Sequence, residues 1–276
     1  MEAVQSGTDS ILIWGISLMN NGPILEVRNL CKSYGGVKAV NNVSFSVNRG
    51  EIVGLIGPNG AGKTTSFNTI AGAEKPTEGD VFLEGKNVTG RSTEQLYHMG
   101  LLRTFQLSQE YPKMTTLENL MVACKDQAGE NILMNWLSPD KVIQRELRVI
   151  EKANQTLEFL GLSHLSGELA GNLSGGQKKL LELGRTMMAD AKVILLDEPG
   201  AGVNPTLMQK IGDMIIDLNQ SRGYTFCLIE HDMQLIERLC HRVIVLAEGR
   251  ILQEGSMKEI RNNSKVVDAY FGSADS

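Results

Sequence analysis

The chain has 276 residues, with 27 Lys and Arg residues, 32 Asp and Glu residues and a formal net charge of −5 at pH 7. This length is sufficient for a core that needs no disulfides, and the acidic balance argues against nucleic acid as a partner, because that affinity comes from Lys and Arg displacing counterions. The four cysteines form no C-x-x-C pair, which favours a reducing compartment, and no apolar run reaches the roughly 18–20 residues that a membrane-spanning helix requires.

The start of the chain differs from the rest. The apolar run ILIWGISLM at 11–19 is preceded by no Lys or Arg, so it lacks the basic region of a secretory signal. Met19 could serve as the initiating residue, and organised sequence begins shortly after it. We therefore expect residues 1–22 to be a disordered extension and residues 23–273 to form the folded domain.

The next part of the chain has strand patterns on both sides of one helix. ILEV at 24–27 is typical of a strand, and 43–47 alternates apolar and polar residues, as in a half-buried antiparallel strand. The continuous apolar run at 51–57 indicates a fully buried strand. A helix is predicted at 62–72 and a further strand with a glycine turn at 81–88.

Helices are predicted through the middle of the chain, from about residue 115 to 190. Buried strands follow at 193–199 and 224–231, and a hairpin at 243–255. Strands that alternate with helices predict an α/β fold with a mostly parallel sheet, into which the helical middle is inserted. Three helix starts carry a capping-box pattern: Thr115 with Glu118, Ser174 with Gln177, and Ser256 with Glu259.

The segment GPNGAGKTT matches the phosphate-binding pattern G-x-x-x-x-G-K-[ST]. A buried strand precedes it and a helix follows, so its backbone N–H groups and the helix N-terminus would surround a triphosphate. Lys63 would contact the β- and γ-phosphates, and the hydroxyl of Thr64 would hold Mg²⁺. The predicted nucleotide-binding residues are Gly57, Pro58, Asn59, Gly60, Ala61, Gly62, Lys63, Thr64 and Thr65.

Two acidic residues end a later apolar strand, in the segment LLDEP. Asp197 would reach the Mg²⁺ through water, and Glu198 could polarise the water that attacks the γ-phosphate. Any surface strand can end in two acids, so the pair indicates catalysis only in combination with the phosphate-binding segment.

The segment NLSGGQKKL contains no nucleophile and no metal ligand, yet it has a chemical use. A capped helix start with two glycines leaves its first N–H groups unshielded, which makes it a binding site for an anion. One nucleotide needs only one such site, so the second one is expected to serve a nucleotide held by another copy. The predicted residues are Ser174, Gly175, Gly176 and Gln177.

The three motifs in this order resemble those of nucleotide-binding subunits of ATP-binding-cassette (ABC) transporters, over about residues 23–273. The resemblance implies a P-loop NTPase cassette with a RecA-like core, an antiparallel β subdomain and an inserted helical subdomain at about 107–180. LSGGQ is the signature of the family, in which two cassettes meet head to tail and each signature closes over the other's ATP. ATP and Mg²⁺ are the implied cofactors, and a second cassette, either a copy or a paralogue, is the implied partner.

Single positions also match the family. Tyr34 occupies the place of the aromatic residue that stacks on adenine, although a tyrosine in the core is the alternative. Gln106 matches the catalytic glutamine that reaches Mg²⁺, and His231 matches the histidine that contacts the γ-phosphate. Asn204 stands where the family usually has Asp, which puts the polar contacts of that loop across the dimer in doubt.

Further stretches resemble the ATPase subunit of branched-chain amino acid importers. The most telling are Phe67-Asn68 and Arg103-Thr104-Phe105, although the sequence alone gives these side chains no chemical role. The implied partners are two membrane permease subunits and, indirectly, a solute-binding protein, with the chain peripheral on the cytoplasmic face of the plasma membrane. Residues 107–116 are expected to line a groove for a permease helix, with a solvated loop as the alternative.

Other functions stay open at this point. ATPases of urea or amide importers and of lipopolysaccharide export are related, and the sequence does not name the substrate. A soluble ABC ATPase acting on nucleic acid or ribosomes usually has two cassettes in one chain or a long coiled coil, and neither pattern occurs here. An ordinary P-loop kinase or GTPase would lack LSGGQ, and the guanine-reading N-K-x-D pattern is absent.

Overall fold

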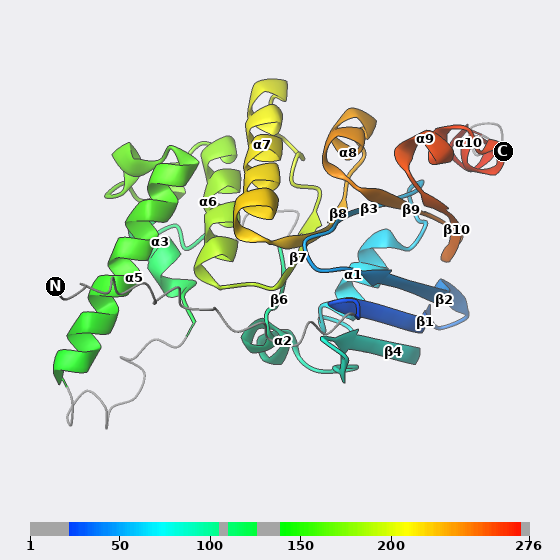
Figure 1. Ribbon diagram of the computed structural model, residues 1–276, viewed down its shortest axis with the longest axis horizontal. Helices are drawn as coiled ribbons and strands as arrows, with labels where there is room; N and C mark the ends of the chain where they lie inside the picture. The colour runs from blue at the N-terminus through cyan, green and yellow to red at the C-terminus, as the bar shows by residue number, and fades with distance from the viewer. Residues whose placement is uncertain (1–21, 105–109, 126–138, 272–276) are drawn as a thin grey trace, which may run out of the picture.

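A computed structural model describes residues 22–104, 110–125 and 139–271 (Figure 1). Gln106 and almost all of the expected N-terminal extension lie outside these ranges. Within them, no helix is both long and apolar enough to cross a bilayer.

A six-stranded sheet forms the centre of the molecule, in the order β10-β9-β3-β8-β7-β6. Strands β9, β3, β8, β7 and β6 are parallel, and β10 is antiparallel to β9, as expected for a hairpin. All residues of β3, β7 and β8 are buried, which explains their continuous apolar sequences. The strands are β3 (Ile52–Ile56), β6 (Leu101–Arg103), β7 (Val193–Asp197), β8 (Thr225–Ile229), β9 (Arg242–Ala247) and β10 (Arg250–Gly255).

A smaller antiparallel sheet has the order β2-β1-β4-β5. Its strands are β1 (Leu25–Tyr34), β2 (Val37–Val47), β4 (Glu78–Leu83) and β5 (Lys86–Asn87). β1 is longer than the strand predicted at 24–27. Its pairing with β2 shifts register after Val27, where Asn29 has a positive φ of 48°. These shifts interrupt the alternation of apolar and polar residues, so the sequence pattern indicates only the first part of the strand. Helix α1 (Lys63–Ile70) packs its Phe67 and Ile70 into a core shared by both sheets.

The two faces of the six-stranded sheet are covered by different layers (Figure 1). On β3, Val53 and Leu55 belong to the core shared with α1 and the antiparallel sheet, whereas Ile52 and Ile56 belong to the other core, which contains residues of most of the remaining helices. The remaining helices are α2 (Thr93–Met99), α3 (Thr116–Val122), α5 (Pro139–Leu160), α6 (Gly175–Met188), α7 (Pro205–Arg222), α8 (Met233–Leu239), α9 (Met257–Arg261) and α10 (Ser264–Phe271).

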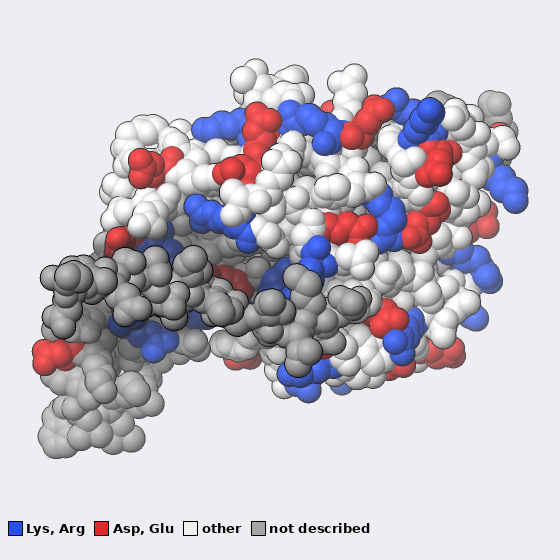
Figure 2. All heavy atoms as spheres, in the orientation of Figure 1, with Lys and Arg blue, Asp and Glu red and all other residues white. Residues whose placement is uncertain are grey.

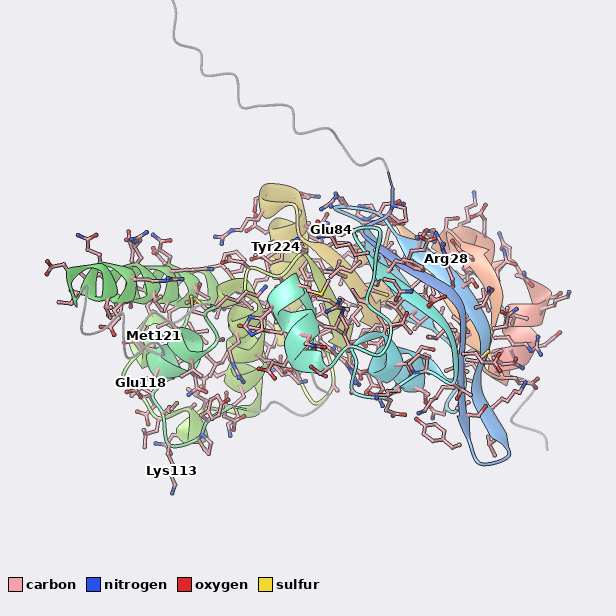
Figure 3. The ribbon with its side chains drawn as sticks, turned by 90° about the horizontal axis from the view of Figure 1, so that it is seen from below. Arg28, Glu84, Lys113, Glu118, Met121 and Tyr224 are labelled. Carbon is pink, nitrogen blue, oxygen red and sulfur yellow. The ribbon has the colours of Figure 1, made fainter. Side chains whose placement is uncertain are left out.

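Helices α3, α5 and α6 pack on one another at one end of the long axis. In the chain they lie between β6 and β7, as predicted for a helical insertion into the sheet domain. Figure 3 shows Lys113 and Glu118 at this end and Arg28 at the opposite end, on the antiparallel sheet. The predicted fold class is therefore confirmed, whereas helices α2, α7, α8 and α10 and the short strand β6 were not predicted from the sequence.

The predicted capping boxes at Thr115, Ser174 and Ser256 are all present, with both reciprocal hydrogen bonds. A fourth box, Ser92 with Gln95, opens α2. These patterns are local in sequence, so they could be read without knowledge of the tertiary structure.

The face shown in Figure 2 carries interspersed acidic and basic side chains outside its grey atoms.

Candidate functional site

The phosphate-binding segment 57–65 connects the buried strand β3 to helix α1. Two of its glycines are required by close contacts within the fold. A Cβ atom at Gly57 would lie 2.1 Å from the carbonyl oxygen of Leu246, and one at Gly62 would lie 2.4 Å from that of Ala39. Their φ angles of 152° and 96° also favour glycine. The loop conformation is thus fixed from outside, by β9 and β2.

Lys63 is buried, and the loop itself supplies its hydrogen-bonding partners. Its Nζ donates hydrogen bonds to the carbonyl oxygens of Gly57, at 2.8 Å, and Pro58, at 3.0 Å. Burial lowers the pKa of Lys63, and the charges of Glu198 and Asp197 oppose this shift. The ammonium group therefore lies within electrostatic reach of both acids of the LLDEP segment.

These two acids lie at the carboxyl end of β7, in different surroundings. Asp197 is buried, and its Oδ2 accepts a hydrogen bond of 2.6 Å from Nη2 of Arg103. Glu198 follows the strand with a φ of 51°, and its N–H donates to the carbonyl oxygen of Ile229 at 2.9 Å. A positive φ is uncommon outside glycine, so the neighbouring strand β8 holds Glu198 in a strained backbone conformation.

His231 follows β8, which lies beside β7 in the sheet. Its Nε2 is 2.9 Å from Oε1 of Glu198. The residue before it, Glu230, is 5% exposed and holds two loops together. Its Oε1 accepts from the N–H of Gly200 at 2.7 Å, and its Oε2 accepts from the N–H of His231 at 3.0 Å.

Tyr34, at the end of β1, is 47% exposed and is therefore not a core residue. Its hydroxyl donates to Oε2 of Glu74, and the ammonium of Lys32 lies 5.0 Å from the centre of its ring. Desolvation and the neighbouring Glu74 raise the pKa of Tyr34, with an opposing hydrogen bond from the side chain of Thr65. The hydroxyl of Tyr34 is therefore near Thr65, the last residue of the phosphate-binding segment.

The signature helix start is open at Gly175, where an added Cβ would meet no atom within 4 Å. Ser174 and Gln177 bond to each other, and Ser174 and Gly175 are exposed. Gly176 has a further role in packing: a Cβ there would lie 2.2 Å from Leu207 Cδ2, so the absence of a side chain lets α6 pack closely against α7. The side chain of Asn204 caps α7 by accepting from the N–H of Leu207.

The protein oxygens near the phosphate-binding segment suit Mg²⁺. Thr64 is exposed in the first turn of α1, and the carboxylate of Asp197 is close enough to Lys63 to affect its pKa. Among the described residues, no group of three or more His, Cys, Asp or Glu could hold a metal by itself. This donor set matches Mg²⁺, which is usually held by one or two protein oxygens together with phosphates and water.

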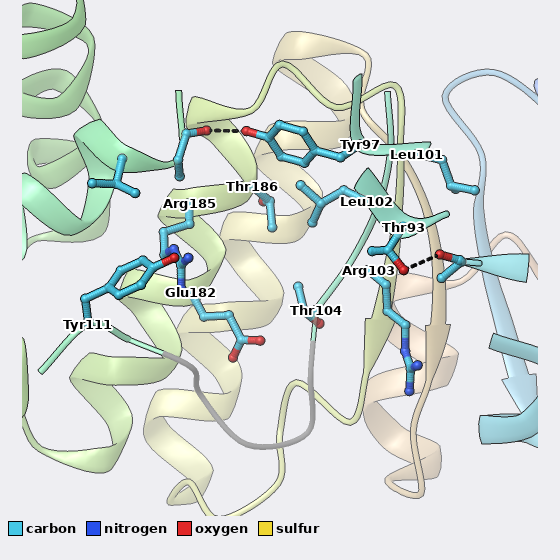
Figure 4. A pocket seen from close by; sticks show the side chains of 13 residues that line it. Thr93, Tyr97, Leu101, Leu102, Arg103, Thr104, Tyr111, Glu182, Arg185 and Thr186 are labelled. Atoms are coloured by element: carbon cyan, nitrogen blue, oxygen red, sulfur yellow. Dashed lines mark hydrogen bonds between the residues drawn. The ribbon is translucent and has the colours of Figure 1, made fainter. Parts of the chain in front are cut away.

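A groove of about 270 Å³ lies between β6 and α2 on one side and α3 and α6 on the other (Figure 4). Tyr97, Leu102, Tyr111 and Val122 give it an apolar lining, and Arg185 and Glu182 add charge. The guanidinium of Arg185 lies 5.3 Å from the ring centre of Tyr111. Of the predicted groove segment 107–116, Tyr111 is the residue that lines it, and residues 107–109 are outside the described ranges.

The sheet thus brings four predicted residues together at one edge: Lys63, Asp197, Glu198 and His231. It does not bring the signature residues into hydrogen-bonding contact with them. Sequence reasoning missed Glu230, whose only signal was its place between a buried strand and His231. Asn68 and Arg103 stand out in the sequence, but the sequence assigns them no chemical role. In the structure their side chains are hydrogen-bonded to each other.

Solved structures with a similar fold define the class of protein as an ATP-binding cassette. A nucleotide-free cassette from an ABC transporter is 42% identical, with a TM-score of 0.78, over 90% of this chain and 99% of that chain. A dimeric bacterial ABC transporter cassette is 25% identical, with a TM-score of 0.69, over 84% and 98% of the two chains.

The family model described as "ABC transporter" matches residues 40–201. A relative from Archaeoglobus fulgidus, named "Probable branched-chain amino acid transport ATP-binding protein LivG", is 42% identical over 92% of this chain and 97% of its own length. The "High-affinity branched-chain amino acid transport ATP-binding protein LivG" of Escherichia coli is 38% identical over 91% and 99%. The chain belongs to the ABC transporter family, and it is an ATP-binding subunit with ATPase activity.

Proposed function

We propose that the chain hydrolyses ATP to power an importer of branched-chain or related amino acids. The observation that carries the proposal is the cluster at the carboxyl edge of the sheet, where the Lys63 ammonium lies within electrostatic reach of Asp197 and Glu198 and the His231 ring lies 2.9 Å from Glu198. The names of the relatives support amino acids as the transported substrate.

ATP binds along the segment 57–65, whose N–H groups and glycines fit phosphate oxygens. When ATP binds, Lys63 exchanges its two carbonyl partners for the β- and γ-phosphates. The phosphates are charged, so they compensate the charge of the ammonium better than neutral carbonyl oxygens do. Tyr34 stacks on the adenine. Its exposure and the nearness of its hydroxyl to Thr65 support this role.

Mg²⁺ would be held by the hydroxyl of Thr64, by Asp197 through water and by Gln106. When bound, it neutralises charge that develops on the transferred phosphate. Glu198 takes a proton from the attacking water, and His231 contacts the γ-phosphate and orients the Glu198 carboxylate from 2.9 Å. The backbone of Glu198, fixed by Ile229, keeps its carboxylate on the side of the nucleotide.

The exposed helix start of Ser174, Gly175, Gly176 and Gln177 binds the ATP held by a second cassette, which is either a copy or a paralogue. Exposure of Ser174 and Gly175 supports this role, because a helix N-terminus without a covering side chain attracts anions. ATP then joins two cassettes, and hydrolysis separates them.

The groove between α2 and α3 receives a helix of a membrane permease subunit. Its apolar lining and the exposed side chains of Tyr111 and Met114 support a protein partner. The chain would act on the cytoplasmic face of the plasma membrane, with two permease subunits and, indirectly, a solute-binding protein. Purification of the tagged chain from mildly solubilised membranes should recover two permeases. Recovery from the soluble fraction alone would contradict the transport role.

The variant Glu198→Gln tests the shared nucleotide site. It should bind ATP and Mg²⁺ but not hydrolyse the ATP, so it should run as a dimer in size-exclusion chromatography at saturating ATP. If the variant stays a monomer under these conditions, both alone and when mixed with a paralogous cassette, the proposal is contradicted.

A second substitution in the same background separates the signature from general surface effects. Adding Ser174→Arg should return the protein to a monomer, because the arginine side chain fills the anion site. Adding Ser221→Arg, at an exposed position near the end of α7, should leave the dimer intact.

A further inference from the structure

Arg103 and Asn68 have no role in the site described so far, yet they contact one of its central residues. Arg103 ends β6, and β6 pairs with β7, which ends in Asp197. The side chain of Arg103 is 8% exposed and that of Asp197 is 3% exposed, with an N–O distance of 2.6 Å. In Figure 4 the Arg103 side chain extends from β6 away from Tyr111 and Arg185, so it borders the groove on the side opposite these two residues.

The guanidinium of Arg103 is held from two directions. Nη2 donates to Asp197 on β7, and Nη1 donates to Oδ1 of Asn68 on α1. A planar guanidinium with two partners from different elements has little freedom to rotate. Asn68 is also four residues after Thr64, so the two lie on the same face of α1, one turn apart.

The contacts continue from Asn68 towards the other end of the nucleotide. Nδ2 of Asn68 donates to Oε1 of Glu74 at 2.8 Å. The other carboxylate oxygen of Glu74 accepts from the hydroxyl of Tyr34 and lies 3.4 Å from the ammonium of Lys32. One polar network thus runs from the carboxylate of Asp197 to the exposed ring of Tyr34.

We propose that Arg103 and Asn68 are positioning residues, which fix the Asp197 carboxylate for Mg²⁺-bound nucleotide and connect it through Glu74 to Tyr34. This inference rests on the proposed roles of Asp197 and Tyr34. It explains why Asn68 and Arg103 occur together in this chain, because each is the hydrogen-bonding partner of the other. An ion pair that served folding alone would affect stability without changing how Mg²⁺ strengthens nucleotide binding.

The test is calorimetric binding of ADP, which is not hydrolysed, with Mg²⁺ and with EDTA. In Arg103→Lys, the ammonium can keep one of the two contacts but not the planar pair, so the gain in affinity due to Mg²⁺ should fall about tenfold, as for a lost charged hydrogen bond. Affinity in EDTA should change little. The matched control is Arg242→Lys, since Arg242 also bridges two side chains, those of Glu51 and Glu254.

Equal Mg²⁺ effects in Arg103→Lys, Arg242→Lys and the parent chain would overturn the proposal. If the parent chain itself binds ADP without any effect of Mg²⁺, the role of Asp197 towards Mg²⁺ fails and this proposal fails with it, whereas the proposed function fails only if the parent chain also does not hydrolyse ATP. Asn68→Ala provides a second variant if Arg103→Lys does not fold, and it should reduce the Mg²⁺ effect in the same direction.

The connection to the adenine side is tested by Tyr34→Phe, which keeps the ring and removes the hydroxyl that donates to Glu74. This change should reduce the Mg²⁺ effect about two- to threefold, the size of a typical net hydrogen bond. It should have no such effect in the Asn68→Ala background. Equal reductions in both backgrounds would show that Tyr34 acts independently and would overturn this part of the network.

Discussion

Glu230 shows how a buried side chain can control its exposed neighbour. Its two carboxylate oxygens accept from the N–H groups of Gly200 and His231, which belong to the loops after β7 and β8. The ring of His231 is thereby fixed through its own backbone, although the ring itself is half-exposed. Glu230 is therefore expected to position His231 relative to Glu198 without contacting the nucleotide.

The change Glu230→Gln should lower the kcat for ATP hydrolysis about ten- to a hundredfold, with little change in KM. In the variant, an amide nitrogen replaces one carboxylate oxygen and faces a backbone N–H group. The hydrogen bond to a charged acceptor is lost, which costs about 1.5–3 kcal/mol. Steady-state ATPase kinetics measure the effect. Glu237→Gln, on the exposed face of α8, should behave like the parent chain. An unchanged kcat in a folded Glu230→Gln protein would refute the role of this carboxylate.

At the scale of elements, α3 organises the segment that leads into it. Asn119, fully buried in α3, donates from Nδ2 to the carbonyl oxygens of Tyr111, Met114 and Thr115. Its Oδ1 accepts from the N–H of Tyr111 at 2.8 Å. One side chain thus satisfies the backbone of a tight segment and leaves the side chains of Tyr111 and Met114 exposed beside the groove.

Asn119→Ala should lower the free energy of unfolding by about 2–3 kcal/mol, because several buried backbone groups would lose their partner. Urea unfolding monitored by circular dichroism provides the measurement. Asn87→Ala removes an exposed asparagine from β5 and should cost less than about 1 kcal/mol. Similar losses for both variants would mean that Asn119 is not the organiser of this segment.

Local sequence patterns predicted the elements that local interactions determine. The capping boxes at Thr115 and Ser174 and the buried strand at 51–57 needed only the residues near them. The short strand β6 has three residues and no periodicity, so nothing in its sequence predicts it. The hydrogen bonds of Arg103 depend on the order of strands in the sheet, and that order is a property of the whole fold.

The candidate site divides in the same way. The phosphate-binding segment and the two acids could be predicted because their spacing is itself the chemical pattern. The second function of Gly176, contact with Leu207, depends on how closely α6 and α7 approach. The buried carboxylate of Glu230 became interpretable only when the two loops it joins were seen side by side.

At the scale of the whole molecule, Cys227 reports on the integrity of the central sheet. It lies in β8, fully buried, and burial raises the pKa of its thiol to about 12. Only the thiolate reacts with alkylating reagents, so the folded protein is protected both sterically and electrostatically. Because the folded pKa is above the unfolded value of about 8.5, this thiol should also make the protein less stable as the pH rises above that value.

Alkylation of Cys227 at pH 8 should therefore require opening of the sheet. ATP with Mg²⁺ at about 100 times its dissociation constant should slow it about a hundredfold, since ligand binding adds about 2.7 kcal/mol to the free energy of opening. Mass spectrometry of labelled peptides gives the rate. The partly exposed Cys31 serves as the internal control and should change much less. Cys227 labelling as fast as Cys31 would contradict the prediction.

The order of strands also bears on how the protein is made. β3, which carries the phosphate-binding segment, and β7, which carries the acids, are not neighbours, because β8 lies between them. A nascent chain on the ribosome contains both motifs before residues 225–229 have been synthesised, but it has no strand with which to join them. We therefore expect a chain truncated before residue 225 to lack ATPase activity even though it contains both motifs, because the strand that aligns them is missing.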